Sequence, residues 1–148
     1  MMTLGFVTQR ASDSQLRALL ELVTRENTAF FLDRIRQGQE TPSTSEAAVR
    51  YCPDQAAHEV MLLDAATLLD QGVGSCGSLA VYEAGLRRAL AQSNGTPAAV
   101  ASGRFGPVVI PRPNHQGVDY WHAVVRTPSG LFDPSRHLQQ VCVTPSYA

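Results

Sequence analysis

The sequence predicts an α+β fold in which N-terminal helices pack on a mainly antiparallel sheet. Apolar residues recur at helical spacing up to residue 92, short β-type runs follow Gly95, and a glycine-rich segment at 72–77 comes directly before a helical pattern. Helices first and strands after are typical of α+β domains rather than of alternating βαβ units. Because 148 residues fit one domain, we expect a single domain, 1–148, with a helical part at 1–94 and a β part at 95–148.

The composition and net charge exclude some classes of binding partner. The chain is 44% hydrophobic and carries a net charge of -1, so it has a core but no basic field for nucleic acid or an anionic membrane. No apolar run approaches the roughly 20 residues that span a bilayer, and residues 1–10 do not resemble a signal peptide. We therefore expect a cytoplasmic protein, with secretion by another route left open.

Cysteine usage indicates at least one thiol. The three cysteines, Cys52, Cys76 and Cys142, cannot all pair within one chain. Their number does not indicate a disulfide scaffold, and a reducing compartment is the simpler assumption. Cys52 and Cys142 have no chemical motif around them and are interpreted as core or incidental residues.

The first two helices are predicted at 13–37 and 54–70. Gly38 is expected to end the first helix, and Gly72 and Gly74 break the pattern of the second. The expected core positions of the first are Leu16, Leu19, Leu20, Val23, Phe30, Phe31 and Ile35. Those of the second are Val60, Met61, Leu63, Leu68 and Leu69.

A third helix is predicted from Ser75 to Gln92 and ends at Asn94-Gly95. Residues three or four apart share one face, which here consists of Leu79, Tyr82, Leu86 and Leu90. Cys76 precedes Leu79 by three residues and is expected on the same side. Arg87 and Arg88 are interpreted as the solvated side of this helix.

The β part begins after Gly95. The expected strands are 98–102, 108–110, 118–126 and 131–133, with a further candidate at 141–143. The loop around Pro111, Pro113 and Gly117 is long and is expected to border a cleft.

The 118–133 segment reads as a hairpin, with Pro128-Ser129 at its tip. Thr127 then opposes Gly130, and Val124 opposes Asp133. His122 and Asp133 become diagonal neighbours on one face, within reach of a hydrogen bond. A slip of one residue would place them on opposite faces.

Cys76, His122 and Asp133 have the chemistry of a thiol nucleophile, its base and the residue that orients the base. A helix start and an imidazolium partner both lower a thiol pKa, and the unpaired N–H groups of the first turn can bind an oxyanion. The three residues predict acyl-transfer chemistry if they meet in space.

The same residues resemble the transglutaminase-like branch of the papain-like cysteine enzymes. Residues 74–80 read Gly-Ser-Cys-Gly-Ser-Leu-Ala, followed by His122-Ala123 on a strand and Asp133-Pro134 on the next. The resemblance covers residues 70 to 136. It implies a transglutaminase-like core with the nucleophile at the start of a central helix, and a catalytic Cys76, His122 and Asp133 acting through a thioester. It implies no cofactor.

The resemblance gives the chemistry better than the substrate. Hydrolysis of a peptide or isopeptide bond is favoured over crosslinking, because the domain is small; the expected partner is a peptide or protein. One rival is a non-catalytic binding or scaffold domain with the same fold inside a larger assembly, since 133–136 resemble small phage-encoded relatives. Another is a deamidating toxin or effector.

The second oxyanion donor stays unassigned. Transglutaminases resemble one another in a tryptophan upstream of the cysteine, but Trp121 beside the histidine is the only tryptophan here. Gln71 and Tyr120 are the candidates. Taken alone, Cys76 is better interpreted as a small buried hydrophobe, His122 can be a core histidine, and Asp133-Pro134 is an ordinary turn.

Three other motif-based interpretations of these residues are rejected. Residues 72–77 match the dinucleotide fingerprint, but a helical segment precedes them and no acid occurs between Glu83 and Asp119. In a direct papain alignment the nucleophile position is Leu79. A zinc site with Cys76 and His122 has no supporting Cys-x-x-Cys or His-x-x-x-His spacing, so no metal is expected.

Overall fold

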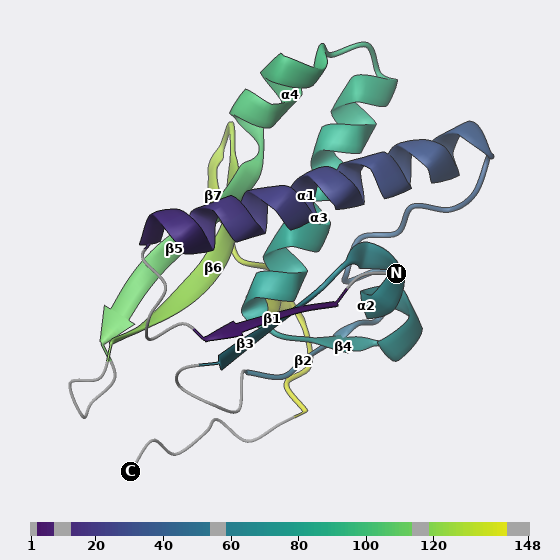
Figure 1. The fold of residues 1–148 in the computed structure, drawn as a ribbon. Coiled ribbons are helices and arrows are strands. Elements are labelled where there is room, and N and C mark those ends of the chain that lie inside the picture. The colour runs from purple at the N-terminus through teal and green to yellow at the C-terminus, as the bar shows by residue number, and fades with distance from the viewer. Residues whose placement is uncertain (1–2, 8–12, 54–58, 114–118, 142–148) are drawn as a thin grey trace.

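The computed structural model describes residues 3–7, 13–53, 59–113 and 119–141, and these form a mixed α+β structure (Figure 1). The helices are α1 (Asp13–Arg36), α2 (Ala65–Gln71), α3 (Cys76–Ser93) and α4 (Ala98–Arg104), with a 3-10 helix, η2 (Pro134–His137). The strands are β1 (Thr3–Val7), β2 (Arg50–Tyr51), β3 (Glu59–Leu63), β4 (Val73–Gly74), β5 (Gly106–Pro113), β6 (Asp119–Thr127) and β7 (Gly130–Phe132). The predicted α+β class is confirmed.

The largest sheet is antiparallel, with the strand order β5-β6-β7. Thr127 pairs with Gly130 and Val125 with Phe132, which is the register that the turn at Pro128-Ser129 predicts. β6 is therefore the central strand, and the register continues without a bulge along β5, where Val109 opposes Ala123. Two smaller sheets pair β1 with β3 antiparallel and β2 with β4 parallel.

Helix α3 forms the centre of the molecule (Figure 1). Its residues from Cys76 to Leu86 are all buried, because α1, α2 and the large sheet surround it. α1 crosses it closely at Gly85, where a Cβ atom would lie 2.6 Å from Cβ of Asn27 and 3.1 Å from the carbonyl oxygen of Thr24. Only a residue without a side chain allows this crossing distance.

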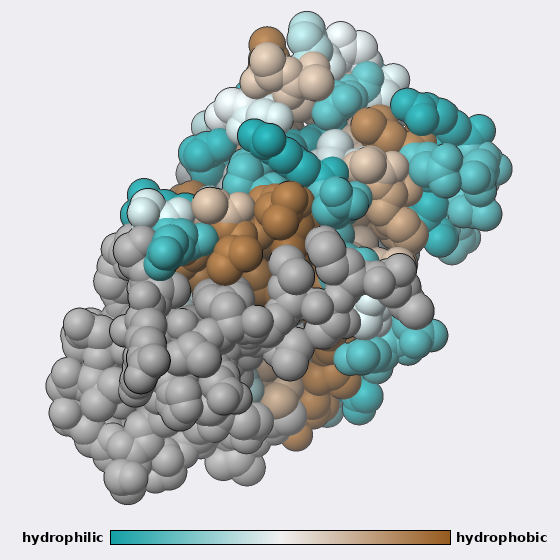
Figure 2. All heavy atoms as spheres, viewed as in Figure 1, coloured by the Kyte–Doolittle hydropathy of each residue, from teal (hydrophilic) through white to brown (hydrophobic). Residues whose placement is uncertain are grey.

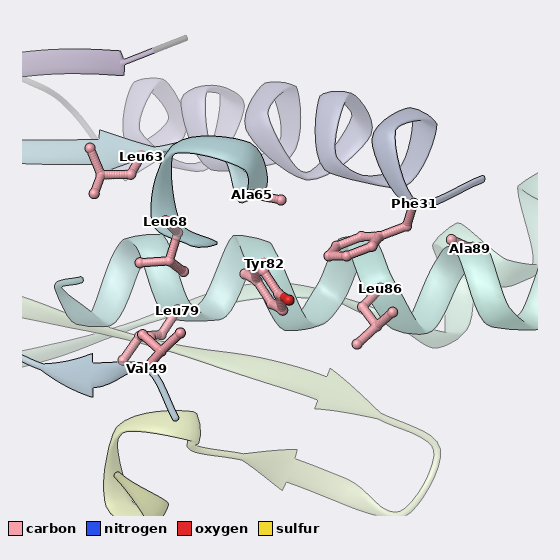
Figure 3. Close-up of a cluster of buried hydrophobic side chains, with 9 residues drawn as sticks. All are labelled: Phe31, Val49, Leu63, Ala65, Leu68, Leu79, Tyr82, Leu86 and Ala89. Carbon is pink, nitrogen blue, oxygen red and sulfur yellow. The ribbon is translucent and has the colours of Figure 1, made fainter. Parts of the chain in front are cut away.

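Two apolar stripes of α3 face different neighbours. Leu79, Tyr82 and Leu86 pack with Phe31 of α1 and Leu68 of α2 in the largest core cluster (Figure 3). A second stripe, Cys76, Ala80 and Ala84, packs with Ala123 and Val125 of β6. The prediction that Cys76 shares the Leu79 face is therefore wrong, because an enclosed helix has more than one apolar face. Leu90, expected in the same stripe, is 40% exposed.

The predicted helix at 54–70 is wrong in its first part. Glu59–Leu63 is strand β3, which pairs with β1, a strand that the sequence reading missed. Asp64 then caps a separate helix, α2, by accepting a 2.9 Å hydrogen bond from the backbone N of Thr67. Residues 54–58 lie outside the described part.

Two further assignments differ in the second half of the chain. The predicted strand at 98–102 is helix α4, because its alanines favour helix when no sheet partner is available. At 141–143, Val141 donates its backbone N–H to the Tyr51 oxygen at 3.0 Å, and the rest lies outside the described residues. The division into a helical 1–94 and a β 95–148 is consequently wrong, since β1 to β4 precede residue 95 and α4 follows it.

Arg88 is not on a solvated face as predicted; it is 2% exposed. Its guanidinium donates to both carboxylate oxygens of Glu21 on α1, at 2.6 and 2.7 Å, and to the carbonyl oxygen of Phe105 at 2.7 Å. The side chain thus ties α3 to α1 and to the start of β5.

The view in Figure 2 shows hydrophilic residues over the far end of α1 and the loop after it, and apolar side chains around the middle of the helix. Leu22, on α1, is 47% exposed. Among the described residues no helix has both the length and the apolar character needed to cross a membrane.

Candidate active site

The thiol of Cys76 lies at the first residue of α3. The backbone of Ser75 is extended, with φ -79 and ψ 172, so the chain turns from β4 into the helix between these two residues. Ser78 fixes the first turn by accepting a 3.0 Å hydrogen bond at Oγ from the backbone N of Leu63. At this position the N–H groups of the first turn have no partner within the helix and carry the positive end of its dipole.

Cys76 is present as a thiol and is 7% exposed. It lies in the cluster with Ala80, Ala84, Ala123 and Val125, and Trp121 packs against the same cluster. The two chain neighbours of His122, Trp121 and Ala123, thus both belong to the surroundings of the thiol. The start of α3 lies against β6 at the level of His122.

His122 and Asp133 form the hydrogen-bonded pair that the hairpin register predicts. Nε2 of His122 lies 2.7 Å from Oδ2 of Asp133, and the two side chains are 11% and 13% exposed. A slip of one residue in β6–β7 pairing would have separated them, so this contact confirms the predicted register.

Hydrogen bonding determines the charge of Asp133. Its Oδ1 accepts from the backbone N of Ser135 at 3.1 Å and from Ser135 Oγ at 2.7 Å. Burial disfavours the carboxylate, but the hydrogen bonds from Ser135 and His122 outweigh it and lower the pKa of Asp133 below its usual value. The ionised carboxylate is only an acceptor, so Nε2 of His122 carries the proton and Nδ1 is left as the basic nitrogen.

The structure does not join the two halves of the predicted site directly. Side chains alternate along a strand, so the His122 ring leaves β6 on the face opposite to Ala123, which belongs to the same cluster as Cys76. In the described part of the chain there is no hydrogen bond between Cys76 and His122. β7 pairs only with residues 125–127, so it does not cover the edge of β6 at His122.

Of the two candidate oxyanion donors, only Gln71 has a side chain within the described residues. Gln71 ends α2 and is exposed. Tyr120 pairs with Arg112 through its backbone on β6, but its side chain lies outside the described residues. The loop expected around Pro111 and Pro113 is wrong there, because both residues belong to strand β5, and residues 114–118 lie outside the described part.

The remaining cysteines and histidines do not assemble a metal centre where the structure is described: no group of three or more His, Cys, Asp and Glu side chains is placed to hold an ion. His137 stacks on Phe132, with ring centroids 5.3 Å apart. Cys52 is disulfide-bonded, which corrects its interpretation as a core or incidental residue, and Cys142 lies outside the described residues.

Sequence reasoning missed two contributors beside Asp133. One is Ser135, whose signal was its position two residues after the aspartate, the spacing of an Asx turn. The other is Arg87, whose guanidinium lies 4.7 Å from the centre of the Phe132 ring and so connects α3 to the residue before Asp133. The sequence carries no signal for this long-range contact.

Comparison of the chain with protein-family models, curated proteins and solved structures finds no significant match. The chemistry of the site therefore rests on its own residues and their contacts.

Proposed function

We propose that the protein is a cysteine enzyme of the transglutaminase-like type, which acts on an amide bond of a peptide or protein through a thioester at Cys76. The observation that carries the proposal is the 2.7 Å hydrogen bond between Nε2 of His122 and Oδ2 of Asp133. A buried histidine whose Nε2 is held by an ionised carboxylate is oriented as a base at Nδ1. The same stretch of β6 packs against the helix start that bears the thiol.

In the proposed reaction, Nδ1 of His122 takes the thiol proton and the Cys76 sulfur adds to the substrate carbonyl carbon. The oxyanion formed accepts hydrogen bonds from N–H groups of the first turn of α3. The C–N bond then breaks, the imidazolium gives its proton to the leaving amine, and a thioester remains. Water, activated by the neutral imidazole, attacks this thioester and releases a carboxylic acid and the thiol; an amine in place of water gives a new amide.

The reaction needs Nδ1 of His122 close to Sγ of Cys76. Hydrogen bonds between a nucleophile and its base are often long without substrate and tighten in the substrate complex. We propose that substrate binds at the edge of β6 near His122, which β7 leaves unpaired. Asp133 holds the ring through Nε2, so the proposed approach of Nδ1 to Sγ takes place with this hydrogen bond intact.

The arrangement of elements supports a transglutaminase-like core. The thiol-bearing helix packs on the strand that carries the histidine, and the next strand leads to the aspartate. The proposed partner is accordingly a peptide or protein substrate.

A non-catalytic binding domain with the same fold is the second candidate. It is favoured by the burial of Cys76, at 7% exposure. Deamidation of a protein by an effector is a variant of the first candidate, in which the leaving group is ammonia.

Product analysis tests the proposal. Unfolded polypeptides are incubated with the wild-type protein, Cys76→Ala and a control, Ser93→Ala, at the exposed far end of α3. Mass spectrometry separates cleavage into fragments, a deamidation shift of roughly one dalton and crosslinked species. We expect one of these products with the wild type and Ser93→Ala and none with Cys76→Ala. Product formation by Cys76→Ala contradicts a thiol mechanism, and no product with any protein favours the binding domain.

A further inference from the structure

We propose that Ser135 is a positioning residue, whose hydroxyl holds the Asp133 carboxylate in the orientation that His122 requires. This inference rests on the proposed function of the site and adds a residue that the Cys76, His122 and Asp133 set does not contain.

The two carboxylate oxygens of Asp133 have different partners. Oδ1 accepts the Oγ–H of Ser135 at 2.7 Å and the backbone N–H of Ser135 at 3.1 Å. Oδ2 lies 2.7 Å from Nε2 of His122. Because Ser135 occupies one oxygen with two donors, rotation about the Cβ–Cγ bond is blocked and the other oxygen stays directed at the imidazole.

The local backbone explains why the donor is residue 135. Asp133 is the N-cap of η2, with φ -107 and ψ 101, and Pro134 follows at the first position of this helix. Proline has no N–H, so the first backbone donor available to the carboxylate is that of Ser135. The serine side chain then adds a second donor to the same oxygen.

Arg136 competes with His122 for the same oxygen of the Asp133 carboxylate. Its Nε lies 3.5 Å from Oδ2 of Asp133, the oxygen that His122 uses. The Arg136 side chain is 72% exposed, so the pair is weak in water, but it draws the carboxylate toward solvent. The two hydrogen bonds that Ser135 donates to Oδ1 keep Oδ2 directed at His122.

The backbone on both sides of Asp133 is held independently of the Ser135 hydroxyl. The Phe132 ring contacts both the guanidinium of Arg87, at 4.7 Å, and the ring of His137, at 5.3 Å. Removal of the hydroxyl is therefore expected to leave η2 folded, so that Ser135→Ala reports on the carboxylate and not on the turn.

The test compares Ser135→Ala with Ser135→Thr, which keeps a hydroxyl, and with Ser129→Ala at the exposed tip of the hairpin. NMR titration follows the Asp133 carboxyl carbon and the His122 Nε2 proton in a Cys76→Ala background, so this readout needs no activity. We expect Ser135→Ala to raise the Asp133 midpoint and to speed exchange of the Nε2 proton, and the other two variants to resemble the parent. In the protein with Cys76 intact, kcat falls roughly tenfold with KM unchanged, the effect of losing about one charge-assisted hydrogen bond.

An Asp133 midpoint and Nε2 exchange rate that stay unchanged in Ser135→Ala overturn the inference, as does a failure of threonine to restore them. If the expected NMR changes occur but the protein forms no product on any substrate, the role of Ser135 toward Asp133 is supported and the proposed function is refuted. The two failures are thus distinguishable.

Discussion

Replacement of Arg88 by methionine tests whether α3 is fixed to α1 by a buried ion pair. The Arg88 side chain is 3% exposed and its partner Glu21 is 33% exposed. Arg88→Met keeps most of the side-chain volume and removes the hydrogen bonds to Glu21 and to the Phe105 carbonyl.

The expected loss follows from burial. Removing one partner of a fully buried pair costs about 3–5 kcal/mol, because the other charge is left uncompensated. Since Glu21 keeps one-third of its surface in water, it is partly solvated after the substitution, and we expect a loss of about 2–3 kcal/mol. At roughly 2–4 °C for each kcal/mol in a chain of this size, the melting temperature falls by about 4–12 °C.

Arg25 is the matched control, because its Nε also contacts Oε2 of Glu21, at 3.3 Å, but its side chain is 76% exposed. Arg25→Met is expected to change the free energy of unfolding by less than about 0.5 kcal/mol. Urea and thermal unfolding followed by circular dichroism measure both variants. If Arg88→Met loses no more stability than Arg25→Met, the assignment of Arg88 as a buried clamp is wrong.

The pH dependence provides an independent check on the same pair. The hydrogen bond from Arg88 is the main cause that lowers the pKa of Glu21 below its ordinary 4.5. The folded-state pKa is below the unfolded value, so the stabilisation is complete above about pH 4.5 and is lost as the pH falls through the lowered pKa. The difference in stability between wild type and Arg88→Met should therefore narrow at acid pH.

Two glycine-to-alanine substitutions form the remaining predictions. Gly85→Ala should lower the free energy of unfolding, measured with denaturant, by about 1–2 kcal/mol. Its Cβ would lie 2.6 Å from that of Asn27 and force α1 and α3 apart. The cost of this clash exceeds the gain in helix propensity that alanine brings. Gly103→Ala in α4, where nothing lies within 4 Å of the new Cβ, should instead gain about 0.5–1 kcal/mol. Equal effects of the two would show that the crossing at Gly85 tolerates a side chain.

The elements that the sequence predicted well are long or bounded by turns. α1 and α3 carry their apolar pattern over many residues, and the Pro128-Ser129 turn set the register that brings His122 to Asp133. Such signals depend on residues close together in the sequence, so they can be read without knowledge of the tertiary fold.

The errors come from residues whose state depends on a distant partner. β3 is a short apolar run that fits a helix or a strand equally well until β1, more than fifty residues earlier, pairs with it. Arg88 appeared solvated because its ion-pair partner Glu21 lies 67 residues away. The face of α3 that carries Cys76 depends on how α3 packs on β6, which neither motif specifies.

The central claim is that His122 activates the Cys76 thiol, and the rate of Cys76 alkylation as a function of pH tests it most directly. A small neutral reagent is used, and modification at Cys76 is quantified by peptide mass spectrometry in the wild type, His122→Ala and Asp133→Asn. We predict that the midpoint of the wild-type rate profile lies at a pH well below the roughly 8.5 of an ordinary thiol. His122→Ala should move this midpoint up toward that value, and the midpoint of Asp133→Asn should fall between the two. An ordinary midpoint that His122→Ala leaves unchanged would contradict the claim.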